Sequence, residues 1–184
     1  IDPEHGGINP DHQTNIPGLE VLENADFMVL FTRFRELPDD KMKYIMDFTN
    51  SGKPMIGLRT STHPFNYTRN KESIYAKWDF RSTDPAGGYG QHVFGETWVN
   101  HHGHHKVEST RGLVNGVVAD HPVLSGVTDV WGTTDVYGIR SLPADAEVML
   151  YGAVLTGMEE DSPINFEKSL MPIAWTRDFV GETG

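Results

Sequence analysis

The densest run of apolar positions lies in "ADFMVLFTRF", where residues 27–31 are all hydrophobic. A continuous apolar run of this length is typical of a central parallel strand that is covered on both faces. The stretch "PMIGL" at residues 54–58 has the same character and predicts a second short buried strand. A helical pattern separates the two runs, so this region predicts a strand–helix–strand unit.

The helical pattern between the two strands has a clear start and end. Pro38 followed by Asp39 and Asp40 is a helix-start signature, since the acids stabilise the positive end of the helix dipole. Gly52 is placed to end the helix. The positions that recur at helical spacing, and that we expect to be buried, are Met42, Ile45, Met46 and Thr49.

The rest of the chain changes character twice. Residues 64–95 show no sustained periodicity and predict a long irregular excursion, a feature that is often functional in compact domains. From residue 105 onward, strand-like stretches such as "AEVMLYGAVLTG" and "LMPIAWTRDF" alternate with turns. The pattern predicts an α/β fold, and the length of 184 residues predicts a single domain over residues 1–184.

Charge and composition narrow the classes of partner. The formal net charge of −11 disfavours binding to nucleic acid or to an anionic membrane surface. The chain has no cysteine, which excludes disulfides, thiolate metal ligands and a cysteine nucleophile. No apolar run is long enough to cross a bilayer. We therefore expect a soluble protein of the cytoplasm or periplasm that binds a small molecule.

Polar side chains follow both predicted strands. "FTRFRELP" supplies Arg33 and Arg35 after the first, and "GLRTSTHPF" supplies Arg59, Thr60 and His63 after the second. Ligands of parallel sheets bind outside the carboxyl ends of the strands, where these groups would converge. Guanidinium groups suit an anionic or hydroxyl-rich ligand. The alternative, in which each arginine only solvates a loop and pairs with surplus acids, stays open.

The turn after the second strand has the form of a nucleophile elbow. In class I glutamine amidotransferases the analogous turn reads Gly, apolar residue, Cys. Here Gly57 and Leu58 match, but Arg59 stands at the position of the cysteine. An arginine stays protonated and cannot attack an acyl group. The sequence therefore argues against amidotransferase activity.

Four of the nine histidines lie in "NHHGHHK". In an extended segment His102 and His104 point to one face, while His101 and His105 point to the other. One hypothesis is a site for zinc or a similar divalent metal, with His102, His104 and His105 as its ligands. The other is proton transfer or ligand binding by these histidines without a metal. Further ligands would have to come from elsewhere in the chain, the candidates being His63, His92, Glu96 and Asp135.

A second candidate group is Asp135 with Tyr137, which would share one face of a strand. A carboxylate beside a phenol can orient a ligand hydroxyl or move a proton, although the acid could equally cap a turn. Trp98, next to the histidines, is a candidate platform for stacking against a ligand.

The order of "GLRTSTHPF", "FGETWVNHHGHH", "HPVLSGV" and "DVYG" resembles the trehalose-utilisation (ThuA-like) family, a branch of the class I glutamine amidotransferase-like superfamily. The resemblance rests on a His-Pro turn, His121-Pro122, and on the acid-x-Tyr element at Asp135 to Tyr137. It covers most of the chain from about Asp26 onward.

The resemblance implies a flavodoxin-like, three-layer sandwich that is truncated at both ends. A first strand would precede residue 1, and a last strand and helix would follow residue 184. It also implies a role in carbohydrate metabolism, on a sugar or an oxidised sugar derivative. The chain would then be a hydrolase, lyase or isomerase, and a homo-oligomer is compatible with that role. The alternative is a non-catalytic carbohydrate-binding module.

Within this interpretation the candidate residues divide into three roles. The predicted catalytic residues are His63, His102, Asp135 and Tyr137. The predicted substrate-binding residues are Arg33, Arg59, Thr60, Trp98 and His101. The predicted metal ligands are His102, His104 and His105. All of these groups are expected to meet at one rim of a parallel sheet.

Overall fold

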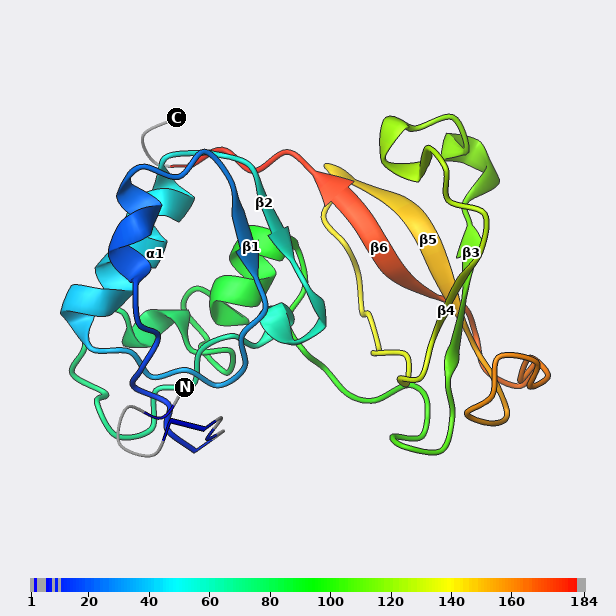
Figure 1. Cartoon of the computed structure of the whole chain (residues 1–184), viewed down its shortest axis with the longest axis horizontal. Helices are drawn as coiled ribbons and strands as arrows, with labels where there is room; N and C mark the ends of the chain where they lie inside the picture. The colour runs from blue at the N-terminus through cyan, green and yellow to red at the C-terminus, as the bar shows by residue number, and fades with distance from the viewer. Residues whose placement is uncertain (1, 3–5, 8, 10, 182–184) are drawn as a thin grey trace. The chain divides into compact units, whose positions relative to one another are not determined.

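The computed structural model of the chain describes residues 2, 6, 7, 9 and 11–181. The chain divides into two compact units, Ile1–Thr97 with Phe179–Gly184, and Trp98–Asp178 (Figure 1). That residues 1–184 form a single domain stays a prediction. The elements expected before residue 1 and after residue 184 likewise stay predictions.

The first unit contains the strand–helix–strand unit that the sequence predicts. β1 (Met28–Leu30) and β2 (Met55–Gly57) pair in parallel, from Met28 opposite Met55 to Leu30 opposite Gly57. α1 (Asp39–Asn50) connects them and begins directly after Pro38. The predicted helix start is therefore confirmed, and Gly52 follows the helix with a φ of 70°, a backbone conformation that glycine adopts without strain.

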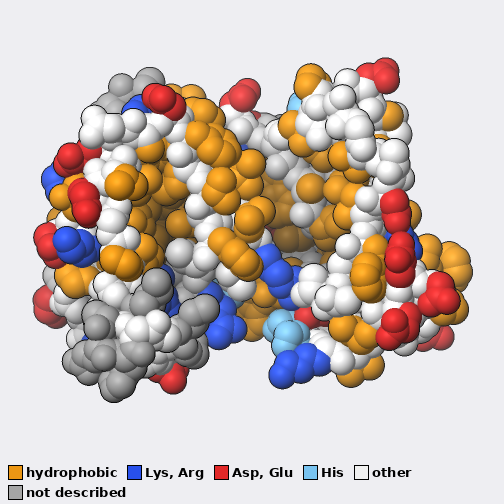
Figure 2. Space-filling view, viewed as in Figure 1, with side chains coloured by type: hydrophobic (Ala, Val, Ile, Leu, Met, Phe, Trp, Pro, Cys, Tyr) orange, Lys and Arg blue, Asp and Glu red, His pale blue; other side chains and the backbone are white. Residues whose placement is uncertain are grey.

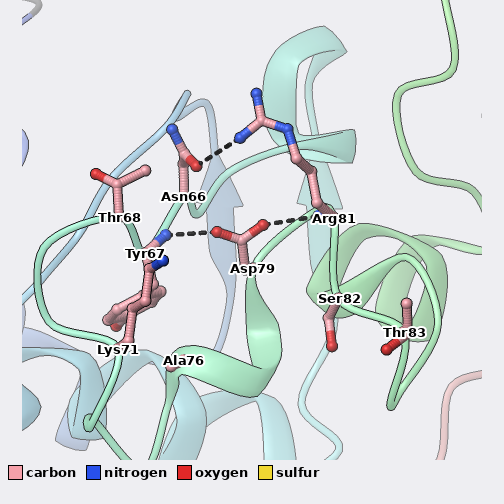
Figure 3. Close-up of a pocket in the computed structure, with 9 residues that line it drawn as sticks. All are labelled: Asn66, Tyr67, Thr68, Lys71, Ala76, Asp79, Arg81, Ser82 and Thr83. Carbon is pink, nitrogen blue, oxygen red and sulfur yellow. Dashed lines mark hydrogen bonds between the residues drawn. The ribbon is translucent and has the colours of Figure 1, made fainter.

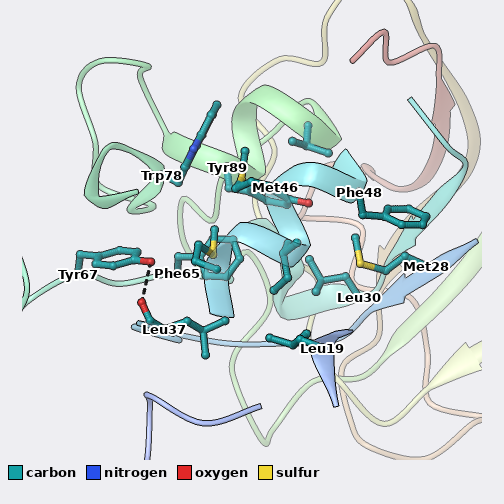
Figure 4. Close-up of a cluster of buried hydrophobic side chains, with 13 residues drawn as sticks. Leu19, Met28, Leu30, Leu37, Met46, Phe48, Phe65, Tyr67, Trp78 and Tyr89 are labelled. Carbon is teal, nitrogen blue, oxygen red and sulfur yellow. Dashed lines mark hydrogen bonds between the residues drawn. The ribbon is translucent and has the colours of Figure 1, made fainter. Parts of the chain in front are cut away.

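The hydrophobic core of the first unit joins α1 to one face of this two-stranded sheet. Met28 and Leu30 of β1 pack in the same buried cluster as the apolar side of α1 (Figure 4). The predicted helix positions Met42, Ile45, Met46 and Thr49 are all buried. Aromatic side chains from the irregular segment extend the cluster, among them Phe65, Trp78 and Tyr89.

The other face of β1 and β2 is not covered as the apolar runs predicted. Val29 is 55% exposed, Ile56 48% and Phe31 64%, and hydrophobic side chains show on the surface over these strands (Figure 2). Side chains alternate along a strand, so α1 can bury only every second residue. The prediction of a strand covered on both faces is thus wrong for the described residues.

Short helical turns and irregular segments make up the remainder. The first unit has η1 (Leu19–Glu23), η2 (Arg59–Thr62), η3 (Ala76–Trp78) and the π-helical turn η4 (Gly90–Phe94). The second unit has η5 (Gly116–Val118) and η6 (Pro122–Leu124). Residues 64–95 carry only η3 and η4, which confirms the predicted irregular excursion.

The second unit is built on an antiparallel sheet with the strand order β4-β3-β5-β6. The strands are β3 (Thr110–Val114), β4 (Val130–Gly132), β5 (Ala146–Val154) and β6 (Met171–Arg177). The chain is therefore a mixed α/β protein with a small parallel sheet and a four-stranded antiparallel sheet. None of the helices in the described part of the chain has the length and apolarity needed to cross a bilayer.

Candidate metal centre

The centre of the candidate site is the buried carboxylate of Asp135 in the second unit, which is 1% exposed. Its Oδ2 lies 2.5 Å from Nδ1 of His101, and its Oδ1 lies 2.8 Å from Nδ1 of His105. The two imidazole rings have centroids 4.9 Å apart. Both carboxylate oxygens thus face imidazole nitrogens from one short loop.

Backbone hydrogen bonds fasten this loop to the segment that carries Asp135. The amides of His102 and Gly103 both donate to the carbonyl of Val136, at 2.9 and 3.1 Å. A Cβ at position 103 would come within 3.2 Å of the Asp135 Cβ, tighter than ordinary van der Waals contact. The glycine in "HHGHH" therefore allows the loop to pass closely over the acid.

The other two histidines point away from the acid. His102 Nε2 donates to the carbonyl of Ser169 at 2.9 Å, and His104 Nδ1 lies 3.3 Å from Glu108 Oε2. His101 and His105 share one side of the loop, and His102 and His104 the other, as the extended alternation predicted. Of the three predicted metal ligands, only His105 lies at Asp135.

Glu108 supports the side of the loop opposite Asp135. Its Oε2 accepts from the backbone amide of His104 at 2.7 Å and from Lys168 Nζ at 2.8 Å, and its Oε1 accepts from Asn165 at 3.2 Å. Lys168 also donates to the carbonyl of His102 at 2.9 Å. Burial alone would raise the pKa of Glu108, but these hydrogen bonds and the charge of Lys168 together lower it to about 2.

Two aromatic side chains lie against His101. Its ring centroid is 5.6 Å from that of Trp98 and 5.4 Å from that of Tyr137, both edge-to-face. Asp135 and Tyr137 do not belong to a regular strand, yet both contact the same imidazole. The predicted acid–phenol pair and the predicted stacking residue thus meet at this histidine.

His101, His105 and Asp135 could hold a metal ion, because one ligand atom from each lies within 4.8 Å of the other two. Imidazole and carboxylate together suit zinc, iron, nickel and similar divalent ions. Structural zinc sites use four protein ligands, whereas three ligands leave an open coordination position for water or a substrate. The donor set therefore matches a reactive rather than a purely structural centre.

The remaining predicted site residues belong to the first unit. His63 is buried and packs between Phe34 and Phe80, with ring centroids 5.1 and 6.0 Å away. Arg59 begins η2 with a φ of 39°, and Thr60 follows it. The ends of β1 and β2 do lie side by side, but convergence of His63, Arg33, Arg59 and Thr60 with the second unit's histidines stays a prediction.

The other histidines and acids considered as ligands make local contacts. His92 packs against Trp78 and Phe179 in the first unit, with ring centroids 5.3 and 5.7 Å away. Glu96 is fully buried and accepts from the amide of Thr97 at 3.0 Å. His121 accepts from the amide of Val123 at 3.1 Å and caps η6, which confirms its interpretation as a turn residue.

The supporting residues of the loop were not found from the sequence. Glu108 follows the histidine run directly, but nothing in its neighbourhood marks it as buried. Lys168 and Asn165 lie about sixty residues further along, and no local pattern links them to the histidines. The hydrogen bonds of Glu108 with His104, Lys168 and Asn165 became apparent from the structure, in which Glu108 is buried.

Comparison with known proteins assigns no family to this geometry. No family model matches the chain, and neither a curated protein nor a solved structure matches it. The chemistry of the chain is therefore argued from its own side chains.

Proposed function

We propose that the chain is a metal-dependent enzyme that acts on a sugar or an oxidised sugar derivative, with His101, His105 and Asp135 as the ligands of a divalent metal. The observation that carries the proposal is the buried Asp135 carboxylate between two imidazole Nδ1 atoms. A carboxylate is seldom fully buried unless it is paired or coordinates a metal.

The ligand types favour zinc or a similar transition metal. Imidazole is a common ligand of such ions, whereas calcium and magnesium prefer oxygen donors alone. One carboxylate and two neutral imidazoles leave a net positive charge on a divalent ion. When bound, such an ion would polarise a carbonyl or hydroxyl oxygen or lower the pKa of a coordinated water.

The surrounding side chains suit a sugar. Trp98 is half-buried and offers an aromatic surface of the kind that packs against sugar rings. Tyr137 contacts His101 and carries a phenol that can donate to or accept from a sugar hydroxyl. The network of Glu108 and Lys168 holds the loop in place, so that His101 and His105 keep their orientation without a ligand.

The resemblance to the trehalose-utilisation family supports the choice of substrate class. A flavodoxin-like, three-layer sandwich is the fold that we propose for the complete protein. The parallel pair β1 and β2, with α1 as its crossover, is consistent with it. Small carbohydrates are the proposed partners, and a homo-oligomer in the cytoplasm or periplasm is compatible with this role.

The test is a search for metal-dependent turnover. Full-length chain would be stripped with a chelator, reloaded with zinc, manganese, iron or nickel, and incubated with disaccharides and their keto and aldonic derivatives. Product formation by mass spectrometry should appear only in reloaded protein and should be lost in Asp135→Asn. Turnover that is unaffected by chelation or by Asp135→Asn would contradict the proposal.

The second candidate is a non-catalytic carbohydrate-binding module. Arg59 favours it, because it occupies the elbow position at which a related enzyme would carry its nucleophile. A module of this kind would bind a sugar from the same panel, with no product formed in any metal form. Replacement of Trp98 by Ala should then weaken binding, while Asp135→Asn should leave it unchanged.

A further inference from the structure

The first unit holds a pocket of about 430 Å³ at the carboxyl end of β1, which the metal centre does not use. In open α/β sheets this end of a strand is where ligands bind. Its lining combines apolar and polar side chains. Its described lining residues are Asp11, Gln13, Asn15, Ile16, Pro17, Phe31, Thr32, Arg33, Phe34 and Arg35.

Hydrogen bonds hold the wall of this pocket in place. Arg35 donates through Nη1 to the carbonyl of His12 at 2.9 Å and through Nε to the carbonyl of Arg33 at 3.1 Å. The amide of Glu36 donates to the carbonyl of Gln13 at 2.9 Å. The segment around Gln13 is thereby fixed against the end of β1, and the pocket exists before any ligand arrives.

The charge of the pocket favours an anion. Arg33 and Arg35 line it with a single carboxylate, Asp11, which is exposed. Arg35 is engaged with backbone carbonyls, whereas Arg33 stacks on the Phe34 ring at 5.3 Å and meets no carboxylate among the described residues. Burial lowers the pKa of Arg35, and the nearby charge of Arg33 lowers it further. A negative ligand would relieve this repulsion.

Two further features mark the same place. The hydroxyl oxygen of Thr32 is buried and finds no hydrogen-bond partner within the described part of the chain. A buried polar atom of this kind is rare and calls for a partner. Phe34 has a φ of 52°, a left-handed conformation that costs a bulky residue energy and tends to persist at functional sites.

We infer that this pocket binds a small carboxylate-bearing molecule, with the Arg33 guanidinium on the carboxylate and the Thr32 hydroxyl bonded to a polar atom of the ligand. A guanidinium grips a carboxylate through two parallel hydrogen bonds. The apolar side chains that line the pocket, Ile16, Pro17 and Phe31, would cover the carbon body of the ligand. This inference does not depend on the metal centre.

A neighbouring pocket of the same unit supplies the control. There Asp79 already accepts from the amides of Tyr67 and Arg81, at 2.6 and 2.7 Å, and the Arg81 guanidinium donates to Asn66 at 3.0 Å (Figure 3). Arg81 is exposed, like Arg33, and lines this second pocket but not the first. Arg81→Gln therefore removes the same charge without touching the proposed site.

The experiment titrates full-length chain with D-glucuronate and with benzoate, and follows the guanidinium and amide signals by NMR. The methyl ester of glucuronate and inorganic phosphate serve as comparisons. At least one carboxylate should bind at the pocket, and Arg33→Gln should weaken it about tenfold or more, as expected for a lost charge-assisted hydrogen bond. Arg81→Gln and Asp135→Asn should leave the affinity unchanged.

Thr32→Val adds a readout that a purely structural role would not give. Because the hydroxyl has no partner, the variant should unfold at the same temperature or higher, while its affinity for the carboxylate falls. The inference is overturned if neither carboxylate binds at millimolar concentration, if the ester or phosphate binds as tightly, or if Arg33→Gln binds like the wild type. A destabilised Thr32→Val with intact binding would equally contradict it.

Discussion

Glu36 of the first unit and Asp135 of the second are both deeply buried acids, and they are partnered in different ways. Glu36 of the first unit is 3% exposed and accepts from the amides of Arg69 and Asn70, both at 2.6 Å, and from Arg69 Nε at 2.9 Å. Asp135 of the second unit is as deeply buried, and its two oxygens face the imidazole nitrogens of His101 and His105.

The two sets of partners differ in whether they can lose a proton and bind a metal. Amide and guanidinium groups keep their protons and offer no lone pair to a cation, so Glu36 can only tie chain segments together. Burial would raise its pKa, but the hydrogen bonds from Asn70 and Arg69 outweigh that effect and lower it. Imidazoles can release a proton and bind a metal. The partners of an acid, rather than its burial, therefore distinguish a structural from a chemical role.

The largest expected effect is a difference in metal affinity between variants of the two acids. Asp135→Asn removes a charged ligand and should weaken binding of zinc or a similar ion about 100-fold or more. Glu36→Gln should leave the affinity unchanged, because the donors that hold Glu36, two backbone amides and the Arg69 guanidinium, cannot bind a metal. Competition with a chromophoric chelator measures both. Equal metal affinities in the two variants would contradict the assignment of Asp135, and not Glu36, as a metal ligand.

The second expected effect is a pH dependence of the free energy of unfolding that arises from Glu108. Like Glu36, Glu108 accepts hydrogen bonds from a backbone amide and a cationic side chain. Its pKa lies near 2 in the folded chain, against 4.5 as the ordinary value. A depressed pKa contributes stability that is complete above the ordinary value and is lost as the pH falls toward the folded one. We expect a loss of about 3 kcal/mol between pH 4.5 and 2.

Denaturant unfolding at a series of pH values measures this slope. Glu108→Gln should flatten it across the same window, because the titrating group is gone. Asp47→Asn is a matched control, since Asp47 is an exposed acid paired with Lys43. An unchanged slope in Glu108→Gln would show that other carboxylates dominate the acid response.

The smallest effect concerns Glu36 itself. Glu36→Gln keeps the volume but turns an amide group toward donors, which should lower the free energy of unfolding by about 2 kcal/mol. Asp47→Asn breaks an exposed pair with Lys43 and should cost less than about 0.5 kcal/mol. Chemical denaturation gives both values, and a Glu36→Gln change as small as that of Asp47→Asn would contradict a structural role.

Local patterns predicted the local features of the fold. The Pro38 start and the spacing from Met42 to Thr49 were enough to place α1, because helix caps and periodicity act over a few residues. The apolar runs located β1 and β2 but not the exposure of Val29, since burial depends on which elements pack on the sheet.

The candidate site was predictable to a similar extent. Alternation separated His101 and His105 from His102 and His104, because side-chain direction in an extended loop is a local property. Alternation could not show which of the two pairs lies at an acid. Asp135 lies thirty residues further along, and its approach depends on the backbone bonds to Val136.

The most direct test of the metal centre is the metal content of full-length, tag-free chain and of two double variants. His101→Ala with His105→Ala removes the imidazoles at Asp135, whereas His102→Ala with His104→Ala removes the same number from the opposite side of the loop. Elemental analysis after exposure to zinc and dialysis should find one ion per chain in the wild type and in the second variant, and none in the first. Metal that is lost from the second variant and kept by the first would contradict the account.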